Sequence, residues 1–273
     1  MTNPESAKLP IPADVPAAFR LAHRHALMLL LASAVACAQS ARADCTGDLG
    51  PDRPGFSTGI NVLSPDCQEL ELGFQDTRDE APSMRAITSP LLLYRVGVGQ
   101  RWELRAAWDG LSWTDTAGNH QRAANDDSLG IKYRLFDGSP WAFSLLGTVS
   151  LPTGSRSLSS KGYDPALGLL WNRALDDKDS LSGTVQAASL SDGDQRIAET
   201  SIAIDFSRAF DSRWGGFIEL YAAKDAGSPV ANTFDGGITY LIGNNLQLDF
   251  NAGIGLNAAA DDRFFGAGAA WRF

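Results

Sequence analysis

Side chains able to carry out catalysis are scarce in this chain. His120 is the only histidine after residue 43, and it lies in a polar stretch beside Gly118, Asn119 and Gln121. A serine nucleophile needs a base oriented beside it, and the sequence has no Gly-x-Ser-x-Gly elbow, Walker loop or paired-cysteine metal motif. We expect His120 to be a solvated loop residue. The sequence therefore predicts no enzyme, no cofactor and no metal site, and a lipid hydrolase is the weaker alternative.

Charged residues recur instead at every second position of short segments. In the clearest segment Glu103, Arg105 and Asp109 alternate with Trp102 and with apolar residues. Successive side chains of a strand point to opposite faces, so each segment has one charged and one apolar face. The charged faces predict the following lumen-lining residues: Glu69, Glu71, Arg95, Glu103, Arg105, Asp109, Lys132, Arg134, Glu199, Asp205, Glu219, Asp235, Asp249 and Arg272.

The elements that would carry these residues are about twelve alternating segments between residues 68 and 273. Each is near the roughly 9 to 11 residues that a tilted strand needs to cross a bilayer. Tight connections at 97–100 and 137–140 contrast with longer polar ones at 114–125 and 152–163. The pattern predicts an all-β, antiparallel, up-and-down transmembrane barrel of about twelve strands in the outer membrane, with short periplasmic turns and longer extracellular loops.

Aromatic residues separate this barrel from a soluble β-sandwich, whose strands also alternate. They gather at the short-turn ends of the segments, in phase with the apolar face. Such rings favour the interface between membrane and water. The predicted girdle consists of Trp102, Tyr133, Trp141, Trp171, Trp214, Tyr240, Trp271 and Phe273. Tryptophan as ordinary core filler is the alternative.

The N-terminus indicates export. Arg20 and Arg24 precede an uncharged apolar run that ends at a small-residue cleavage site. We expect residues 1–43 to be a signal peptide with a long n-region, residues 44–67 a periplasmic segment before the barrel, and residues 68–273 the barrel. Lipidation of Cys37 is a weaker alternative.

Two further cysteines, Cys45 and Cys67, bracket the segment before the barrel. An exported protein with two cysteines is expected to join them, because the periplasm is oxidising. Two separate thiols remain the alternative. The bracketed segment holds Asp52, Arg53 and Pro54, and Arg53 could enter an acidic lumen so that the segment narrows the pore. A periplasmic stub tied by the disulfide is the other reading.

Several motifs resemble one known family. They are Asp52-Arg53-Pro54 before the first strand, Glu69-Leu70-Glu71-Leu72-Gly73, Gly130-Ile131-Lys132-Tyr133-Arg134, Leu151-Pro152-Thr153-Gly154 and Gly237-Ile238-Thr239-Tyr240. In order and spacing they are similar to the outer-membrane transporter family named for the meta-pathway of phenol degradation. The terminal strand ending in Phe273 resembles the signal that barrel assembly machinery recognises. The resemblance implies a transporter of small solutes, with aromatic compounds suggested by the family name.

The charge of the chain limits which partners it can bind. Residues 44–273 hold 19 bases and 30 acids, so no basic patch suits a nucleic acid. The predicted inward residues include nine acids and five bases, so a lumen that conducts should favour cations or neutral solutes over anions. We expect passive diffusion of small solutes, with outer-membrane lipids and lipopolysaccharide as neighbours. A barrel filled by a charge network, acting only in binding or structure, is the alternative; the sequence leaves the oligomeric state open.

Overall fold

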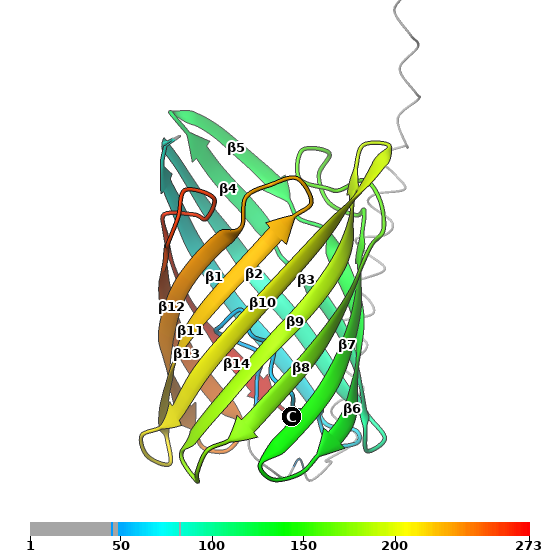
Figure 1. Cartoon of the computed structure of the whole chain (residues 1–273), viewed down its shortest axis with the longest axis vertical. Helices are drawn as coiled ribbons and strands as arrows, with labels where there is room; N and C mark the ends of the chain where they lie inside the picture. Colours follow the sequence, from blue (N-terminus) through cyan, green and yellow to red (C-terminus); the bar gives the residue numbers. More distant parts are fainter. Residues whose placement is uncertain (1–44, 46–48, 82) are drawn as a thin grey trace, which may run out of the picture. The chain divides into compact units, whose positions relative to one another are not determined.

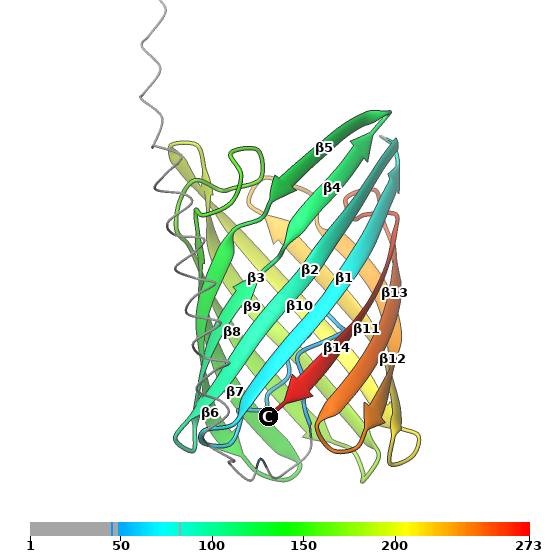
Figure 2. The same cartoon turned by 180° about the vertical axis from the view of Figure 1, so that it is seen from behind.

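A computed structural model describes Cys45, residues 49–81 and residues 83–273. The chain divides into two units, residues 1–41 and residues 42–273, and every described residue belongs to the second. The expected signal peptide and Cys37 lie outside the described residues. The fold of the second unit is shown from opposite sides in Figures 1 and 2.

The described residues form β-strands joined by turns and loops. Among them, no helix is long and apolar enough to cross a membrane. The strands are β1 (Gln68–Glu80), β2 (Ser83–Val98), β3 (Trp102–Trp108), β4 (Leu111–Thr116), β5 (Asn119–Ala124), β6 (Asp127–Asp137), β7 (Trp141–Leu151), β8 (Asp164–Ala174), β9 (Asp179–Asp192), β10 (Gln195–Ala209), β11 (Trp214–Asp225), β12 (Ala231–Ile242), β13 (Leu246–Gly255) and β14 (Arg263–Arg272).

These strands close into one antiparallel barrel. The first strand, β1, pairs with β2 on one side and with β14 on the other, which closes the ring. The C-terminal half of β2 pairs with β3 and its N-terminal half with β4, while β6 pairs with β3 and β5 with β4. Thus β3 with β4, and β5 with β6, each fill one position in the wall. The prediction of a barrel with twelve strand positions is confirmed.

One predicted loop is wrong. Residues 114–125 belong mostly to β4 and β5, which pair as a hairpin above the rest of the wall (Figure 2). Its tight turn at Ala117 and Gly118 has positive φ at both residues. The polar composition of these residues suggested a loop. Strands that extend beyond a bilayer can face water on both sides, so they need no apolar face. His120 therefore lies in a strand rather than in a loop.

The barrel buries charged side chains and exposes apolar ones, the reverse of a soluble protein. Charged residues such as Glu69, Arg95 and Lys132 are fully buried within it, whereas apolar residues such as Leu169 and Ile204 are 40% and 43% exposed on its outer wall. A soluble sandwich would bury the apolar face. This arrangement is typical of a barrel whose outer wall contacts lipid.

Aromatic pairs ring the short-turn end of the outer wall. Trp102 lies against Tyr133, Trp141 against Trp171, Trp214 against Tyr240, and Trp271 against Phe273, with ring centroids 4.3, 6.1, 4.6 and 4.6 Å apart. These are the residues predicted as the girdle. Their position agrees with a membrane interface at that end.

Candidate functional site

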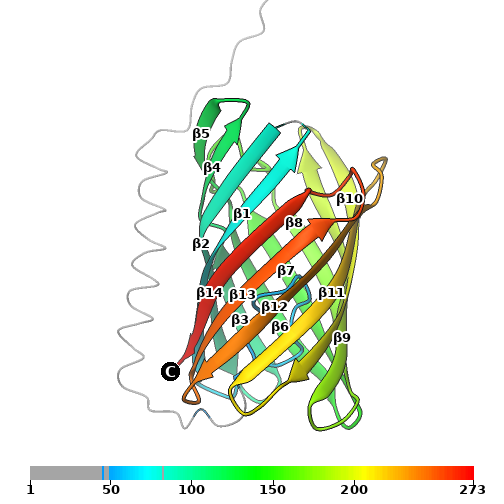
Figure 3. The ribbon, with the colours of Figure 1, turned by 90° about the vertical axis from the view of Figure 1, so that its left-hand side faces the viewer.

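The lumen holds an inner segment of the chain. Residues 49–66, called the plug below, enter and leave at the short-turn end and lie within the ring of strands (Figure 3). Of the two arrangements that the sequence leaves open for residues 44–67, the structure has the plug inside the barrel and not outside it. Backbone and side chains of the plug bond to eight strands: β1, β2, β3, β6, β7, β9, β11 and β13.

Most of the predicted lumen residues surround the plug. Their relative exposures are 0–6% for Glu69, Glu71, Arg95, Glu103, Lys132, Asp205, Glu219, Asp235, Asp249 and Arg272. Arg105, Arg134 and Glu199 are half-buried. Asp109 differs, because it lies in the break between β3 and β4 and is exposed.

Arg95 is the centre of a buried charge cluster. Its Nη1 lies 2.7 Å from Glu69 and 3.2 Å from Glu71, and its Nε lies 3.0 Å from Glu103. The same guanidinium donates to the plug carbonyls of Gly50 and Asn61, each at 3.1 Å. Because a buried arginine needs acceptors for all its donors, the plug completes a site that the strands alone leave open.

Asp52 of the plug sits among cations. Its carboxylate lies 3.1 Å from Lys132 and 3.8 Å from Arg95, and it pairs with Arg105. Burial alone would raise the pKa of the Asp52 carboxyl, but Arg105, Lys132 and Arg95 outweigh burial and hold that pKa well below its usual range. Lys132 also donates to the plug carbonyl of Gly59 at 2.7 Å. Asp52 is therefore an anion that fixes the plug to this wall.

Arg53 points away from this cluster, toward β14 and β13, and pairs with Asp249 at 3.1 Å. It lies over two glycines: a Cβ at Gly73 would come within 2.3 Å of its guanidinium, and one at Gly268 within 2.4 Å of its Nε. The two glycines face each other across the junction of β1 and β14. Absence of side chains at these positions makes the space that Arg53 fills.

The far wall holds the plug by its backbone. Glu219 accepts bonds from the backbone N–H groups of Phe56 at 2.7 Å and Ser57 at 2.6 Å. Asn251 donates to the Pro54 carbonyl at 3.0 Å. The ring of Phe56 stacks on Tyr221, with centroids 4.3 Å apart, and meets Phe264 edge-on at 5.5 Å. The tip of the plug is therefore held by both polar and aromatic contacts.

Charge is distributed unequally around the lumen. The wall of β1, β2, β3 and β6 mixes three glutamates with Arg95, Arg105 and Lys132, whereas adjacent strands β10 to β13 contribute Asp205, Glu219, Asp235 and Asp249. On this second wall the ion pair from the plug is that of Arg53. Neither carboxylate oxygen of Asp235 has a hydrogen-bond partner among the described residues, by distance and angle. The acid surplus of the lumen thus lies on one side.

Both ends of the plug are fixed near the C-terminus. A disulfide joins Cys45 to Cys67, and the backbone of Gly97 exchanges bonds with Asp66 and Cys67. The Cys67 residue precedes β1, whose first residue, Gln68, pairs with Phe273. The plug is consequently a closed loop that hangs into the lumen from the short-turn end.

Family and fold comparisons agree with this geometry. The family model described as "Putative MetA-pathway of phenol degradation" matches residues 84–273. The chain belongs to this phenol-degradation family. A search of curated proteins finds no match. The matched region begins within β2, so the plug lies before it.

Solved structures share the fold of this family member. The COG4313 outer membrane channel from Pseudomonas putida F1 has a TM-score of 0.64 at 12% identity, over 81% of this chain and 99% of that one. A KdgM porin in complex with disordered oligogalacturonate gives 0.53 at 12% identity, over 76% and 99%. The NanC porin gives 0.51 at 8% identity, over 75% and 98%. At these identities the likeness shows the fold alone.

The remaining catalytic candidate is poorly placed for chemistry. The His120 side chain is 78% exposed, and its ion-pair partner is Asp115 at 3.5 Å. Among the described residues, no group of three or more histidines, cysteines or acids could hold a metal ion. A catalytic base must be held beside its nucleophile, and this exposed imidazole is not.

Sequence reasoning missed several lumen contacts. Ser144 donates to the Ile60 carbonyl at 2.7 Å, and Thr184 accepts from the Thr58 backbone at 3.1 Å. Both lie at inward positions of their strands, so strand phase could have found them. The search for lumen residues considered charged side chains and passed over neutral ones.

Proposed function

We propose that this protein is an outer-membrane channel for small neutral or cationic solutes, and that displacement of the plug controls the width of its pore. The observation that carries the proposal is the four-carboxylate wall of β10 to β13 inside a closed barrel with an apolar exterior. Rings of one charge sign in a pore favour counterions and repel ions of like charge. The acidic wall therefore favours cations and admits uncharged molecules.

The solute class follows from charge and from the family. Phenols are neutral near pH 7, so an acidic lumen does not repel them, whereas aromatic acids are anions. The stacking of Phe56 of the plug on Tyr221 supports aromatic solutes, because the Tyr221 ring would become available to a solute when the plug is displaced. We propose neutral aromatic compounds as solutes. An anionic sugar polymer, such as the oligogalacturonate named with the KdgM porin, is not expected here.

Conductance in a planar bilayer tests the channel. The exported protein should give discrete steps, and a salt gradient should show a preference for cations. Deletion of residues 46–66 should increase the conductance of each step, because it removes the segment that bonds to eight strands of the wall.

The outcomes separate the alternatives. An anion preference would contradict the acidic wall as the selective element. Unchanged conductance after the deletion would show that the plug does not restrict the pore. If neither the full chain nor the deletion variant conducts, although both migrate as folded barrels on unheated gels, the protein is a closed barrel with a binding or structural role.

A further inference from the structure

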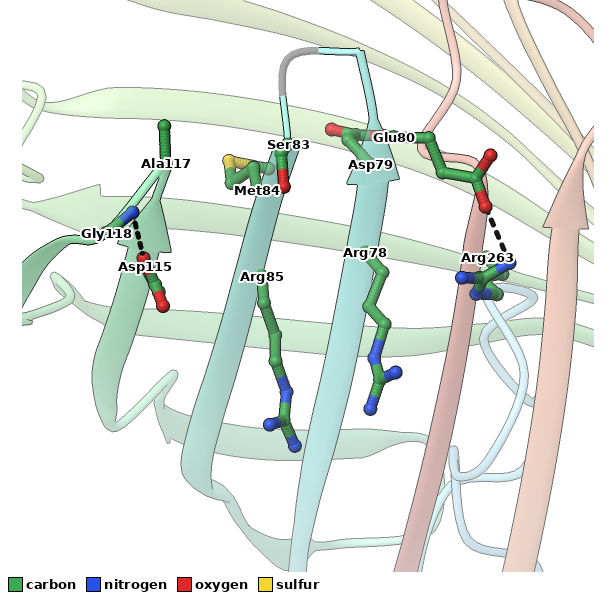
Figure 4. Close-up of a pocket in the computed structure, with 10 residues that line it drawn as sticks. All are labelled: Arg78, Asp79, Glu80, Ser83, Met84, Arg85, Asp115, Ala117, Gly118 and Arg263. Carbon is green, nitrogen blue, oxygen red and sulfur yellow. Dashed lines mark hydrogen bonds and ion pairs between the residues drawn. The ribbon is translucent and has the colours of Figure 1, made fainter.

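Arginines from three adjacent strands form a row on the outer wall near the long-loop end. Arg78 of β1 is paired in register with Arg263 of β14 on one side and with Arg85 of β2 on the other. The register between β1 and β14 is unbroken, and it places Asp76 opposite Phe265, which is 37% exposed on the outer wall. Since Arg78 lies two residues from Asp76, the arginine row (Arg263, Arg78 and Arg85) faces outward. Figure 4 shows the three side chains on neighbouring strands.

Neighbouring carboxylates hold the arginine row in place but do not use all of its hydrogen-bond donors. Asp76 accepts from the Nε of Arg78 at 3.2 Å and from the Nε and Nη2 of Arg85 at 3.0 and 2.5 Å. Arg263 uses Nη1 on Glu80 at 3.0 Å. The side chains of Arg78, Arg85 and Arg263 are 44%, 50% and 54% exposed, respectively. Terminal nitrogens of each guanidinium thus stay available on the surface, in a fork geometry that matches phosphate oxygens.

Apolar side chains lie directly below this row, toward the middle of the barrel. The register of the next level down joins Phe265, Asp76, Ile87 and Trp113 across four strands. Trp113 is 39% exposed, and the Arg122 guanidinium lies 5.3 Å from its ring centroid. Arginines above exposed rings and aliphatic groups match the boundary between headgroups and acyl chains.

Carboxylates lie beside and above the row: Asp115 is paired in register with Arg85, and Asp79 and Glu80 follow Arg78 in β1. A surface hollow of about 410 Å³ between the β1–β2 and β4–β5 hairpins is lined by the arginine row together with Asp79, Glu80 and Asp115 (Figure 4). A carboxylate repels phosphate but accepts hydrogen bonds from hydroxyl groups. The mixture suits a phosphate attached to a sugar better than a free anion or a simple phospholipid headgroup.

We propose that this hollow binds the phosphorylated sugar headgroup of an outer-leaflet glycolipid. The arginine row contacts the phosphate, the carboxylates accept bonds from sugar hydroxyls, and acyl chains pack on the Phe265, Ile87 and Trp113 level. Short turns of such barrels face the periplasm, so the long-loop end places the hollow in the leaflet that contains lipopolysaccharide.

Binding of purified lipid A tests the proposal. The full chain in detergent is titrated with bisphosphorylated lipid A, and bound lipid is counted by native mass spectrometry. The triple variant Asp76→Asn, Arg78→Gln, Arg85→Gln removes two arginines and the acid between them, so no carboxylate is left unpaired. We expect its affinity to fall by about tenfold or more, since hydrogen bonds to charged groups contribute about 1.5 kcal/mol or more each. Arg263→Gln, whose partner Glu80 is exposed, gives the same test if the triple variant does not fold.

The matched control removes outward cations at the other end of the barrel. Arg173 lies over Trp141 and Arg208 pairs with Asp179, both near the short turns; Arg173→Gln with Arg208→Gln should leave lipid A affinity unchanged. The proposal would be overturned if the triple variant and Arg263→Gln both bound lipid A as tightly as the wild-type chain does. It would also be overturned if the wild-type chain bound dephosphorylated lipid A, or phosphatidylglycerol, as tightly as bisphosphorylated lipid A. Competition by inorganic phosphate at the same concentration as lipid A would instead indicate a free-anion site.

Discussion

Arg95 shows how a single residue joins the plug to the wall. It is completely buried and has three glutamates and two plug carbonyls as acceptors. Buried ion pairs contribute little net stability when both partners are present, but loss of one partner leaves uncompensated charge. Arg95 therefore supplies the positive charge that lets the buried glutamates around it remain close together.

Replacement of Arg95 by Gln should destabilise the barrel strongly. Glu69, Glu71 and Glu103 would remain buried without their shared cation, and the expected loss is about 3–5 kcal/mol in the free energy of unfolding. Urea titration in lipid vesicles, followed by tryptophan fluorescence, measures it. Arg263→Gln is the control, because its pair with Glu80 is exposed on both sides and should contribute less than about 1 kcal/mol. Equal losses for the two variants would contradict the central role of Arg95.

Asp52 makes a prediction about pH. Its pKa is lowered in the folded protein, so its contribution to plug docking is complete above its unfolded pKa of about 3.9 and is lost as pH falls toward the folded value. The difference in conductance between the wild-type chain and Asp52→Asn should stay constant from neutral pH to about pH 4. It should shrink only in stronger acid. A difference that already disappears between about pH 6 and pH 5 would show that the fold raises the pKa of Asp52 above its usual value instead of lowering it.

At the scale of elements, glycines in the wall make room for the plug. Gly73→Ala would place a Cβ 2.3 Å from the Arg53 guanidinium, so Arg53 must leave its position above β1 and its pair with Asp249 must weaken. We expect more frequent openings in single-channel records. Gly168→Ala in β8 is the control, because its Cβ would meet neighbours at 3.6 Å or more. Identical opening rates in the two variants would mean that Arg53 does not hold the plug.

Strand phase accounts for what could be predicted at this scale. Alternation around Trp102 and Glu103 located the wall and its inward charges because a period of two residues is a direct result of strand geometry. Breaks in that period were not predictable. The register between β1 and β2 shifts between Gly73 and Gln75, and this shift reverses the phase of Arg85 relative to Arg95. Simple alternation therefore does not place Arg85 on the outer wall beside Arg78. The plug contacts arise between residues as far apart as Arg53 and Asp249, and no local pattern records them.

For the whole molecule, the apolar exterior predicts different costs for charge on the two faces. Val185 and Ala188 lie in β9, where Val185 is 48% exposed and pairs with Leu169 and Ile202 on the outer wall, whereas Ala188 has the inward phase. Val185→Arg should cost about 2–4 kcal/mol of unfolding free energy in vesicles. Ala188→Arg should cost much less, because its side chain can remain in the lumen. Similar costs would contradict a lipid-facing outer wall.

The attachment of the plug also has a topological consequence. Because the disulfide of Cys45 with Cys67 holds both ends of residues 49–66 near the same rim, no chain end has to be threaded through the ring of strands. The loop would be able to enter the cylinder after the strands have closed. Under the proposed gating, each opening of the barrel would be reversible, because the disulfide keeps the displaced plug attached to the short-turn rim.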